Sequence, residues 1–172
     1  MNQKSDNLNR RLYFMKDLAE QYSNEGFIFF TQYNFSEALA NFDKAIAINS
    51  NIAEVWSHRG HVLYELGRHA EAVDSFDRAV TINPNIAEAW SIRGDALREL
   101  GRHAEAVDSY DKAVTINPNY SEAWSFRGDA LRKLGRHAEA DDSFDKVVAI
   151  KQDYTEAWEN REITRQQQNK TP

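Results

Sequence analysis

Two histidines, His58 and His61, stand three residues apart in a polar segment and follow Glu54. On a helix this spacing places both imidazoles on one face, about one turn after the carboxylate. Imidazole nitrogens and carboxylate oxygens are ligands of zinc, and Asp95 is a candidate further ligand from another helix. Ligating histidines are normally oriented by neighbouring acceptors, however, and the sequence shows no such pattern. We therefore expect no metal ion here.

A serine and a histidine at one-turn spacing, Ser57 and His61, are the nearest approach to a nucleophile and its base. No third residue completes that arrangement. The glycines recur at regular places and form no phosphate-binding loop. The chain contains no cysteine, which removes thiol nucleophiles, disulfides and cysteine metal sites. We predict that the protein is not an enzyme and holds no cofactor.

The distribution of charged and apolar residues limits the classes of partner. The 172 residues carry a net charge of −6, and Lys and Arg alternate with Asp and Glu. Nucleic acid binding requires a clustered basic surface, so DNA and RNA are not expected partners. The longest apolar run, at 27–30, is too short to cross a membrane, and the first residues lack the apolar region of a secretory signal. We expect a soluble, cytoplasmic protein, with which the absence of cysteine agrees.

One nine-residue segment occurs three times. GRHAEAVDS stands at 67–75 and at 101–109, and GRHAEADDS at 135–143, which makes the period 34 residues. Residues 53–86 and 87–120 are identical at 26 of 34 positions. A period of roughly 20–50 residues is typical of arrays of stacked structural repeats. The sequence therefore predicts several copies of one small structural unit.

Each unit is predicted to contain two helices. In one unit they cover 87–100 and 103–116, where apolar residues recur at helical spacing. Asn85 followed by Glu88 resembles a capping box at the start of the first helix. Gly101 suits the left-handed turn at its end. The unit is therefore expected to be a helix–turn–helix pair.

The repeat resembles the tetratricopeptide repeat (TPR). In one unit the residues that carry the resemblance are Trp90, Gly94, Ala106, Tyr110, Ala113 and Pro118. Arginine precedes the close-packing glycine, where the family often has leucine, at Arg59, Arg93 and Arg127. These arginines and the aspartates of the second helices are expected to form charge rows between adjacent units. The resemblance implies an all-α, right-handed solenoid of antiparallel helix pairs.

The period divides the chain into four units with flanking segments. The units are expected at 19–52, 53–86, 87–120 and 121–154, after an amino-terminal segment and helix at 1–18 and before a capping helix at 155–168 and a tail at 169–172. In the capping helix Glu162 replaces the close-packing glycine, as expected where no second helix follows. Asp141 replaces Val73 and Val107 in the last copy of the nine-residue segment. We interpret it as an end-of-array residue with only the capping helix beside it.

The resemblance also implies where a partner binds, because in this family the first helices line a concave groove that holds a peptide or helix. The matching residues are Asn24, Phe27, Phe30, His58, His61, Tyr64, Ile92, Asp95, Arg98, Phe126, Asp129, Arg132 and Lys133. These positions differ between units while the packing positions repeat, which stacking alone does not require. We therefore predict a non-catalytic scaffold for a protein or peptide ligand with apolar anchors and mixed charge.

Some family members hold the terminal carboxylate of a ligand with Lys, Arg and Asn in this groove. The matching places here hold Ser57, Ser91, His61 and Asp95, so this carboxylate clamp is not expected. A solvated face without a ligand is the alternative for the groove positions.

A second class of function, self-assembly, stays open. Residues 5–18 carry Leu8, Leu12, Met15 and Leu18 at helical spacing. This helix is expected to pack on the first unit, or else to associate with another copy or a partner. The array ends offer a further surface for a homo-oligomer, since an incompletely covered stacking face accepts another copy.

Overall fold

The computed structural model describes residues 3–151 and 155–168, without the side chains at 3–12, 156–157 and 167–168. Every regular element in these ranges is a helix, which confirms the expected all-α fold. The chain divides into two compact parts, Met1–Pro84 and Asn85–Pro172, called here the amino-terminal and carboxyl-terminal parts. The predicted tail at 169–172 lies outside the described residues, as does the predicted boundary near residue 154.

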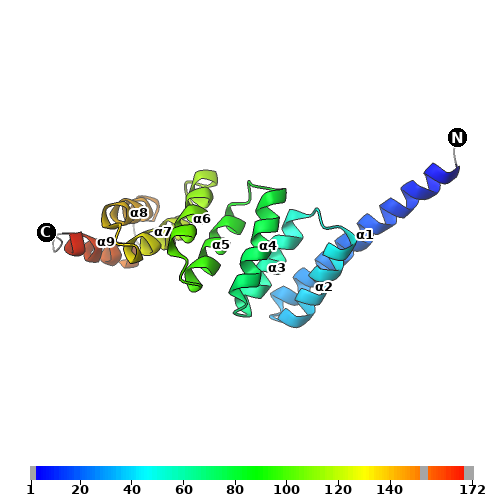
Figure 1. Cartoon of the computed structure of the whole chain (residues 1–172), viewed down its shortest axis with the longest axis horizontal. Coiled ribbons are helices and arrows are strands. Elements are labelled where there is room, and N and C mark those ends of the chain that lie inside the picture. Colours follow the sequence, from blue (N-terminus) through cyan, green and yellow to red (C-terminus); the bar gives the residue numbers. More distant parts are fainter. Residues whose placement is uncertain (1–2, 152–154, 169–172) are drawn as a thin grey trace. The chain divides into compact units, whose positions relative to one another are not determined.

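The amino-terminal part is built from consecutive helices that pack side by side (Figure 1). They are α1 (Gln3–Thr31), α2 (Phe35–Ile48), α3 (Ala53–Glu65) and α4 (His69–Ile82). α1 packs against α2, α2 against α3, and α3 against α4. Short turns join them, so each helix runs antiparallel to the one before it, as the repeat predicts.

The carboxyl-terminal part repeats this arrangement and adds a last helix. Its helices are α5 (Ala87–Glu99), α6 (His103–Ile116), α7 (Ser121–Lys133), α8 (His137–Ile150) and α9 (Thr155–Gln168). Each packs against the next, and α5 also contacts α7. Within this part, α5 and α7 are first helices, α6 and α8 are second helices, and α9 covers α8.

In each helix pair, a glycine of the first helix faces an aromatic ring of the second. A Cβ on Gly94 would lie 2.6 Å from the ring of Tyr110, closer than such atoms approach. The other pairs are Gly26 with Phe42, Gly60 with Phe76, and Gly128 with Phe144. All four rings are fully buried. The two helices of each pair can therefore pack this closely only because glycine has no side chain at this position.

The repeated segment GRHAEAVDS forms the turn into the second helix. Gly67 has a left-handed φ of 72°, and Arg68 is the N-cap residue of α4. The Arg68 guanidinium donates to both carboxylate oxygens of Glu71, at 2.7 and 2.6 Å. Buried Ser75 accepts a 2.7 Å hydrogen bond from Arg59 and donates to the Glu71 carbonyl. The equivalent contacts recur in the carboxyl-terminal part, so these nine residues are repeated for structural reasons.

The expected charge rows are present within each part. An arginine of a first-type helix pairs with an aspartate of the preceding second helix, as Arg59 with Asp43 (2.7 Å), Arg127 with Asp111 (2.5 Å) and Arg161 with Asp145 (2.5 Å). Each guanidinium also lies over a tryptophan ring of its own helix. The rows therefore join successive helix pairs, with α9 taking part as the last member.

Asp141 contacts the last helix, α9, directly. Its side chain is only 18% exposed and accepts a 3.0 Å hydrogen bond from Arg165 Nε of α9. Arg161, also on α9, lies 3.9 Å from the same carboxylate. In the preceding repeat the same position holds Val107, which is buried. The substitution thus lets α8 form ion pairs with two arginines of α9.

Two expected boundaries differ in the structure. α1 is one continuous helix of 29 residues, so no break separates residues 18 and 19. Its second half packs on α2, and its first half extends beyond α2 (Figure 1) rather than folding back on the first unit. The capping box at α5 is absent, because Ile86 is the N-cap residue and makes no side-chain cap hydrogen bond.

Candidate functional site

The predicted groove residues of α1 and α3 form an interleaved aromatic face. The Phe27 ring lies 5.2 Å from the His58 imidazole, and the Phe30 ring lies 4.9 Å from that of His61. Phe27 and Phe30 are themselves 6.4 Å apart. Phe27 remains 45% exposed although its helix packs on two others. The structure therefore brings four of the predicted residues into one surface.

The two histidines of this face contact rings rather than a set of carboxylates. His58 also stacks on buried Phe42, at 5.6 Å, and His61 Nε2 lies 3.7 Å from Glu65. Across the described residues, no group of three or more His, Asp or Glu side chains is placed to hold a metal ion. The centre of the Tyr64 ring lies 5.3 Å from that of His69, the first residue of α4. Asn24, which was also predicted to line the groove, is exposed on α1.

In the carboxyl-terminal part, the predicted residues of α5 and α7 form a polar face. The Tyr110 hydroxyl donates a 2.7 Å hydrogen bond to Asp95 Oδ1. Burial raises the pKa of the Asp95 carboxyl, and the hydrogen bond from Tyr110 and the charge of Arg98 partly oppose this rise. The Arg98 guanidinium lies over the Phe126 ring, 5.4 Å from its centre. Ile92 is half-buried on α5.

The same face continues toward the turn ends of α5 and α7. Arg132 pairs with Asp129 at 2.8 Å and donates a 3.1 Å hydrogen bond to Asn160 of α9. A cavity of about 290 Å³ is lined by Arg98, Glu99, His103, Asp129, Arg132 and Lys133. Its cationic and anionic side chains are interspersed, with Arg98 also paired to Glu99 at 2.9 Å. Such a surface suits a ligand that carries charges of both signs.

Three participants in this face were not predicted from the sequence. Tyr110 is a packing residue, and its hydroxyl reaches Asp95 only because the ring lies against Gly94. The sequence did distinguish Tyr110, because the same position in the other second helices holds phenylalanine, which has no hydroxyl. His103 is the first residue of α6 and Asn160 lies on α9, and neither position belongs to the first helices from which the groove residues were predicted.

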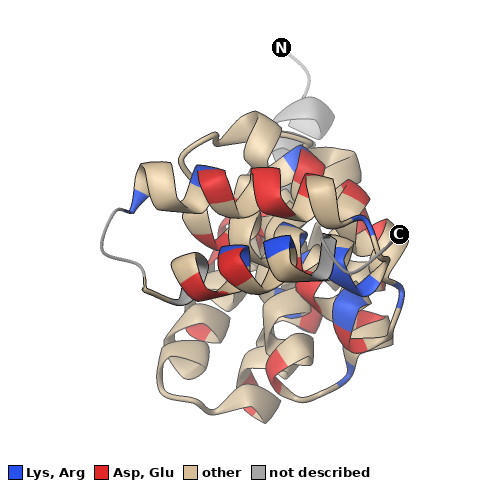
Figure 2. Ribbon diagram, turned by 90° about the vertical axis from the view of Figure 1, so that its left-hand side faces the viewer, with Lys and Arg blue, Asp and Glu red and all other residues tan. Residues whose placement is uncertain are grey.

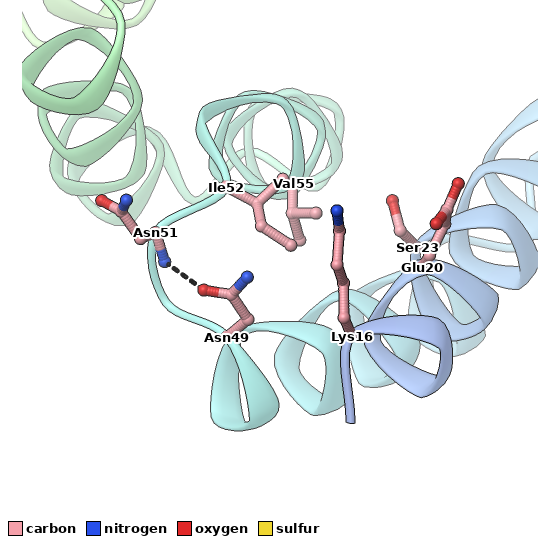
Figure 3. Close-up of a pocket in the computed structure, with 7 residues that line it drawn as sticks. All are labelled: Lys16, Glu20, Ser23, Asn49, Asn51, Ile52 and Val55. Carbon is pink, nitrogen blue, oxygen red and sulfur yellow. Dashed lines mark hydrogen bonds between the residues drawn. The ribbon is translucent and has the colours of Figure 1, made fainter. Parts of the chain in front are cut away.

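A further cavity lies beside α1, at the turn between α2 and α3 (Figure 3). Its volume is about 390 Å³, and its lining comprises Lys16, Glu20, Ser23, Asn49, Asn51, Ile52 and Val55. The Asn51 backbone N–H donates a 3.0 Å hydrogen bond to Asn49 Oδ1, which holds the turn.

The charges of the chain are mixed throughout. Figure 2 shows acidic and basic residues interspersed along the helices. No helix in the part of the chain that the structure describes is long and apolar enough to span a membrane.

Comparison with protein-family models matches most of the chain. The model described as tetratricopeptide repeat matches residues 51–119 and 85–153, and one described as TPR repeat matches 26–67. The first alone spans 51–153, more than half of the 172 residues. The chain belongs to the tetratricopeptide repeat family. A search of curated proteins found no match for this TPR chain.

Solved structures share the arrangement of this TPR protein. The crystal structure of MamA superposes with a TM-score of 0.85 at 22% identity, covering 89% of this chain and 84% of that one. YrrB, described as a TPR protein with an unusual peptide-binding site, gives 0.80 at 25% identity, over 87% and 77%. The first TPR of Spaghetti (RPAP3), bound to an HSP90 peptide, gives 0.68 at 23% identity, over 70% and 95%. The likeness to MamA and RPAP3 shows the fold alone.

Proposed function

We propose that this TPR protein is a non-catalytic scaffold whose first helices bind an extended peptide or a helix of another protein. The observation that carries the proposal is a contrast between positions of the repeat. Packing residues recur from unit to unit, whereas the position after the close-packing glycine holds Phe27, His61, Asp95 and Asp129 in turn. The position three residues later holds Phe30, Tyr64, Arg98 and Arg132. Stacking of units does not require this variation, but recognition of an asymmetric ligand does.

The aromatic face of α1 and α3 suits an apolar anchor of the ligand. Phe27 is half-exposed beside His58, and Phe30 lies between Phe27 and His61. Large side chains of this kind contribute most of the binding free energy in protein interfaces, because they exclude water over a wide area. A leucine, phenylalanine or tryptophan of the ligand is the expected occupant.

The polar face of α5 and α7 suits backbone and charged groups of the ligand. Asp95 is held by Tyr110, and Arg132 by Asp129 and Asn160, so these side chains are ordered before a ligand binds. Ordered polar groups lose little conformational entropy on binding. Lys133 is exposed at the edge of the cavity and offers a cation to an acidic side chain.

Two of the similar structures support a peptide as the ligand class. YrrB is described with a peptide-binding site, and the RPAP3 domain is bound to a peptide of HSP90. The carboxylate clamp of some relatives is not part of the proposal, because Asp95 and Asp129 would repel an acidic terminus.

A peptide selected from a random library on the wild-type chain provides the test, with its affinity then measured by calorimetry on four variants. Phe27→Ser and Lys133→Ala alter the two faces. Ile28→Ser, at a neighbouring α1 residue with a similar exposed fraction (52%), and Lys112→Ala, on α6, are matched controls. Circular dichroism verifies that all four fold.

We expect each face variant to weaken binding about tenfold or more, and each control to bind as wild type. Equal affinity for wild type and both face variants would contradict the proposal. So would a loss of affinity in the controls that matches the loss in the face variants.

A further inference from the structure

The cavity beside α1 has a counterpart in the carboxyl-terminal part, two repeats later in the sequence. Its polar lining residues Glu20, Ser23, Asn49 and Asn51 correspond there to the identical residues Glu88, Ser91, Asn117 and Asn119. The turn is also the same, because the Asn119 N–H donates a 3.1 Å hydrogen bond to Asn117 Oδ1, as the Asn51 N–H donates to Asn49 Oδ1 at 3.0 Å. The two places therefore share a turn and a set of polar side chains.

One residue differs between the two places. Tyr120, the N-cap residue of α7, stands where Ile52 is the N-cap residue of α3. Tyr120 is half-buried, and its hydroxyl makes a side-chain hydrogen bond with Ser91 of α5, which is only 2% exposed. Isoleucine is shorter and carries no hydroxyl. The 4-hydroxyphenyl ring that the chain supplies between α5 and α7 is therefore missing between α1 and α3.

The cavity has the shape and chemistry for such a ring. Its volume of about 390 Å³ lies in the range of small-ligand sites, roughly 300–1,000 Å³. Figure 3 shows apolar Ile52 and Val55 on one side and Ser23 and Glu20 of α1 on the other. Lys16 extends between the two sides, where its ammonium group can lie over the face of an aromatic ring.

We propose that this cavity binds a tyrosine side chain of a partner protein, with the ring against Ile52 and Val55 and the hydroxyl at Ser23. The inference rests on the proposed function only in taking a bound peptide as the source of the ring. Ser23 precedes Phe27 by about one turn of α1. A peptide on the aromatic face of α1 and α3 therefore reaches the cavity with a neighbouring residue.

A backbone amide NMR titration of the full chain with N-acetyltyrosinamide tests the proposal. The dissociation constant is expected to be about millimolar, because the probe supplies a single side chain, with chemical shift changes at Ser23, Asn51 and Val55. N-acetylphenylalaninamide lacks the hydroxyl and should bind about threefold or more weakly. Ser23→Ala should abolish this preference for the tyrosine probe while keeping the binding of the phenylalanine probe.

Filling the cavity from within provides a second test. Ile52→Tyr supplies the ring that Tyr120 supplies in the other part, and it should weaken binding of the tyrosine probe about tenfold or more. Ile28→Tyr, which adds the same side chain at an exposed position of α1, is the matched control and should bind as wild type. Phe27→Ser should also keep wild-type affinity, because it alters the aromatic face and not the cavity. Circular dichroism verifies that each variant folds.

Several results would overturn the proposal. They are the absence of shift changes at the cavity up to the solubility limit of the probe, equal affinity for the two probes, and unchanged affinity of folded Ile52→Tyr. Probe binding that is lost with Phe27→Ser would assign the ring to the aromatic face instead. Binding of p-cresol tenfold more tightly than the tyrosine probe would show that the cavity excludes a peptide chain, and would rule out a protein as its ligand.

The two proposals fail separately. Library peptides that bind the first-helix faces while the probe does not bind the cavity would support the proposed function and overturn this inference. Probe binding at the cavity with no peptide selected from the library would contradict the proposed function and support the preference of the cavity for a 4-hydroxyphenyl ring.

Discussion

The hydroxyl of Tyr110 donates a 2.7 Å hydrogen bond to the carboxylate of Asp95, and so joins a core side chain of α6 to the candidate binding face of α5. The other second helices have Phe42, Phe76 and Phe144 at this position, and their rings carry no hydroxyl. Asp129, one repeat after Asp95, pairs with Arg132 instead. The orientation of Asp95 is therefore set by a residue whose first role is packing against Gly94.

Tyr110→Phe should remove this hydrogen bond while keeping the ring in place. We expect the free energy of unfolding to fall by about 1–2 kcal/mol, because Asp95 is left partly buried without its donor. The pKa of Asp95 should rise further, since the hydrogen bond from Tyr110 lowers it. Urea unfolding and carboxyl NMR titration measure the two effects, with the exposed Tyr13→Phe as the control. An unchanged Asp95 pKa would show that the hydroxyl does not hold the carboxylate.

The raised pKa of Asp95 predicts a pH dependence of stability. Because burial raises the pKa above the ordinary value of about 3.9, the folded chain binds more protons than the unfolded chain between the two values. The stability that this group contributes is thus present below about pH 4 and is lost as the pH rises through the window.

We therefore expect the unfolding free energy of wild type, relative to Asp95→Asn, to fall as the pH rises from about 4 and then to level off. Urea unfolding of both proteins across this range gives the difference directly. A difference that grows in favour of wild type with rising pH would mean that the carboxylate is stabilised by its surroundings.

Tyr33 occupies a turn position that glycine holds in the later units. Its φ of 59° is left-handed, and its ring is 82% exposed. Tyr33→Gly should raise the free energy of unfolding by about 1 kcal/mol, because the side chain is strained in this conformation and buries little surface. Gly67→Ala, at a φ of 72°, is the reciprocal variant and should lower stability by a similar amount. Thermal unfolding of both checks the prediction, which a destabilised Tyr33→Gly would contradict.

Asp141 should couple energetically to the capping helix. A double-mutant cycle of Asp141→Asn and Arg165→Gln is expected to give a coupling of about 0.5–1 kcal/mol, since the pair is 3.0 Å apart and only partly exposed. The coupling should shrink in 1 M salt. Zero coupling at low salt would show that this ion pair does not stabilise the contact between α8 and α9.

Much of the fold could be predicted from the sequence because a stacked repeat must repeat its packing residues. Gly94 and the ring at residue 110 recur at fixed spacing in every full unit, and this spacing defines both helices and their contact. The turn at Gly101 could be predicted for the same reason, because this glycine also recurs at the same spacing. Periodicity reports local geometry well because each unit contacts mainly its neighbours.

Departures from the period were harder to interpret. The N-cap of α5 is Ile86 rather than Asn85, and this position depends on the geometry of the preceding turn. The boundary at residue 18 came from projecting the 34-residue period backwards, although no turn residue interrupts the helical pattern there. The ion pair of Asp141 with Arg165 joins residues 24 apart, and such pairing is not visible in composition or spacing.

The most direct test of the account is the location of a bound peptide. In a backbone amide NMR titration of the wild-type chain with a library-selected peptide, we expect chemical shift changes on the first helices, at residues around Phe27, His61, Asp95 and Phe126. The second helices α2, α4, α6 and α8 should change little. Changes confined to the second helices or to residues 3–17, with the first-helix faces unperturbed at saturation, would contradict binding at these faces.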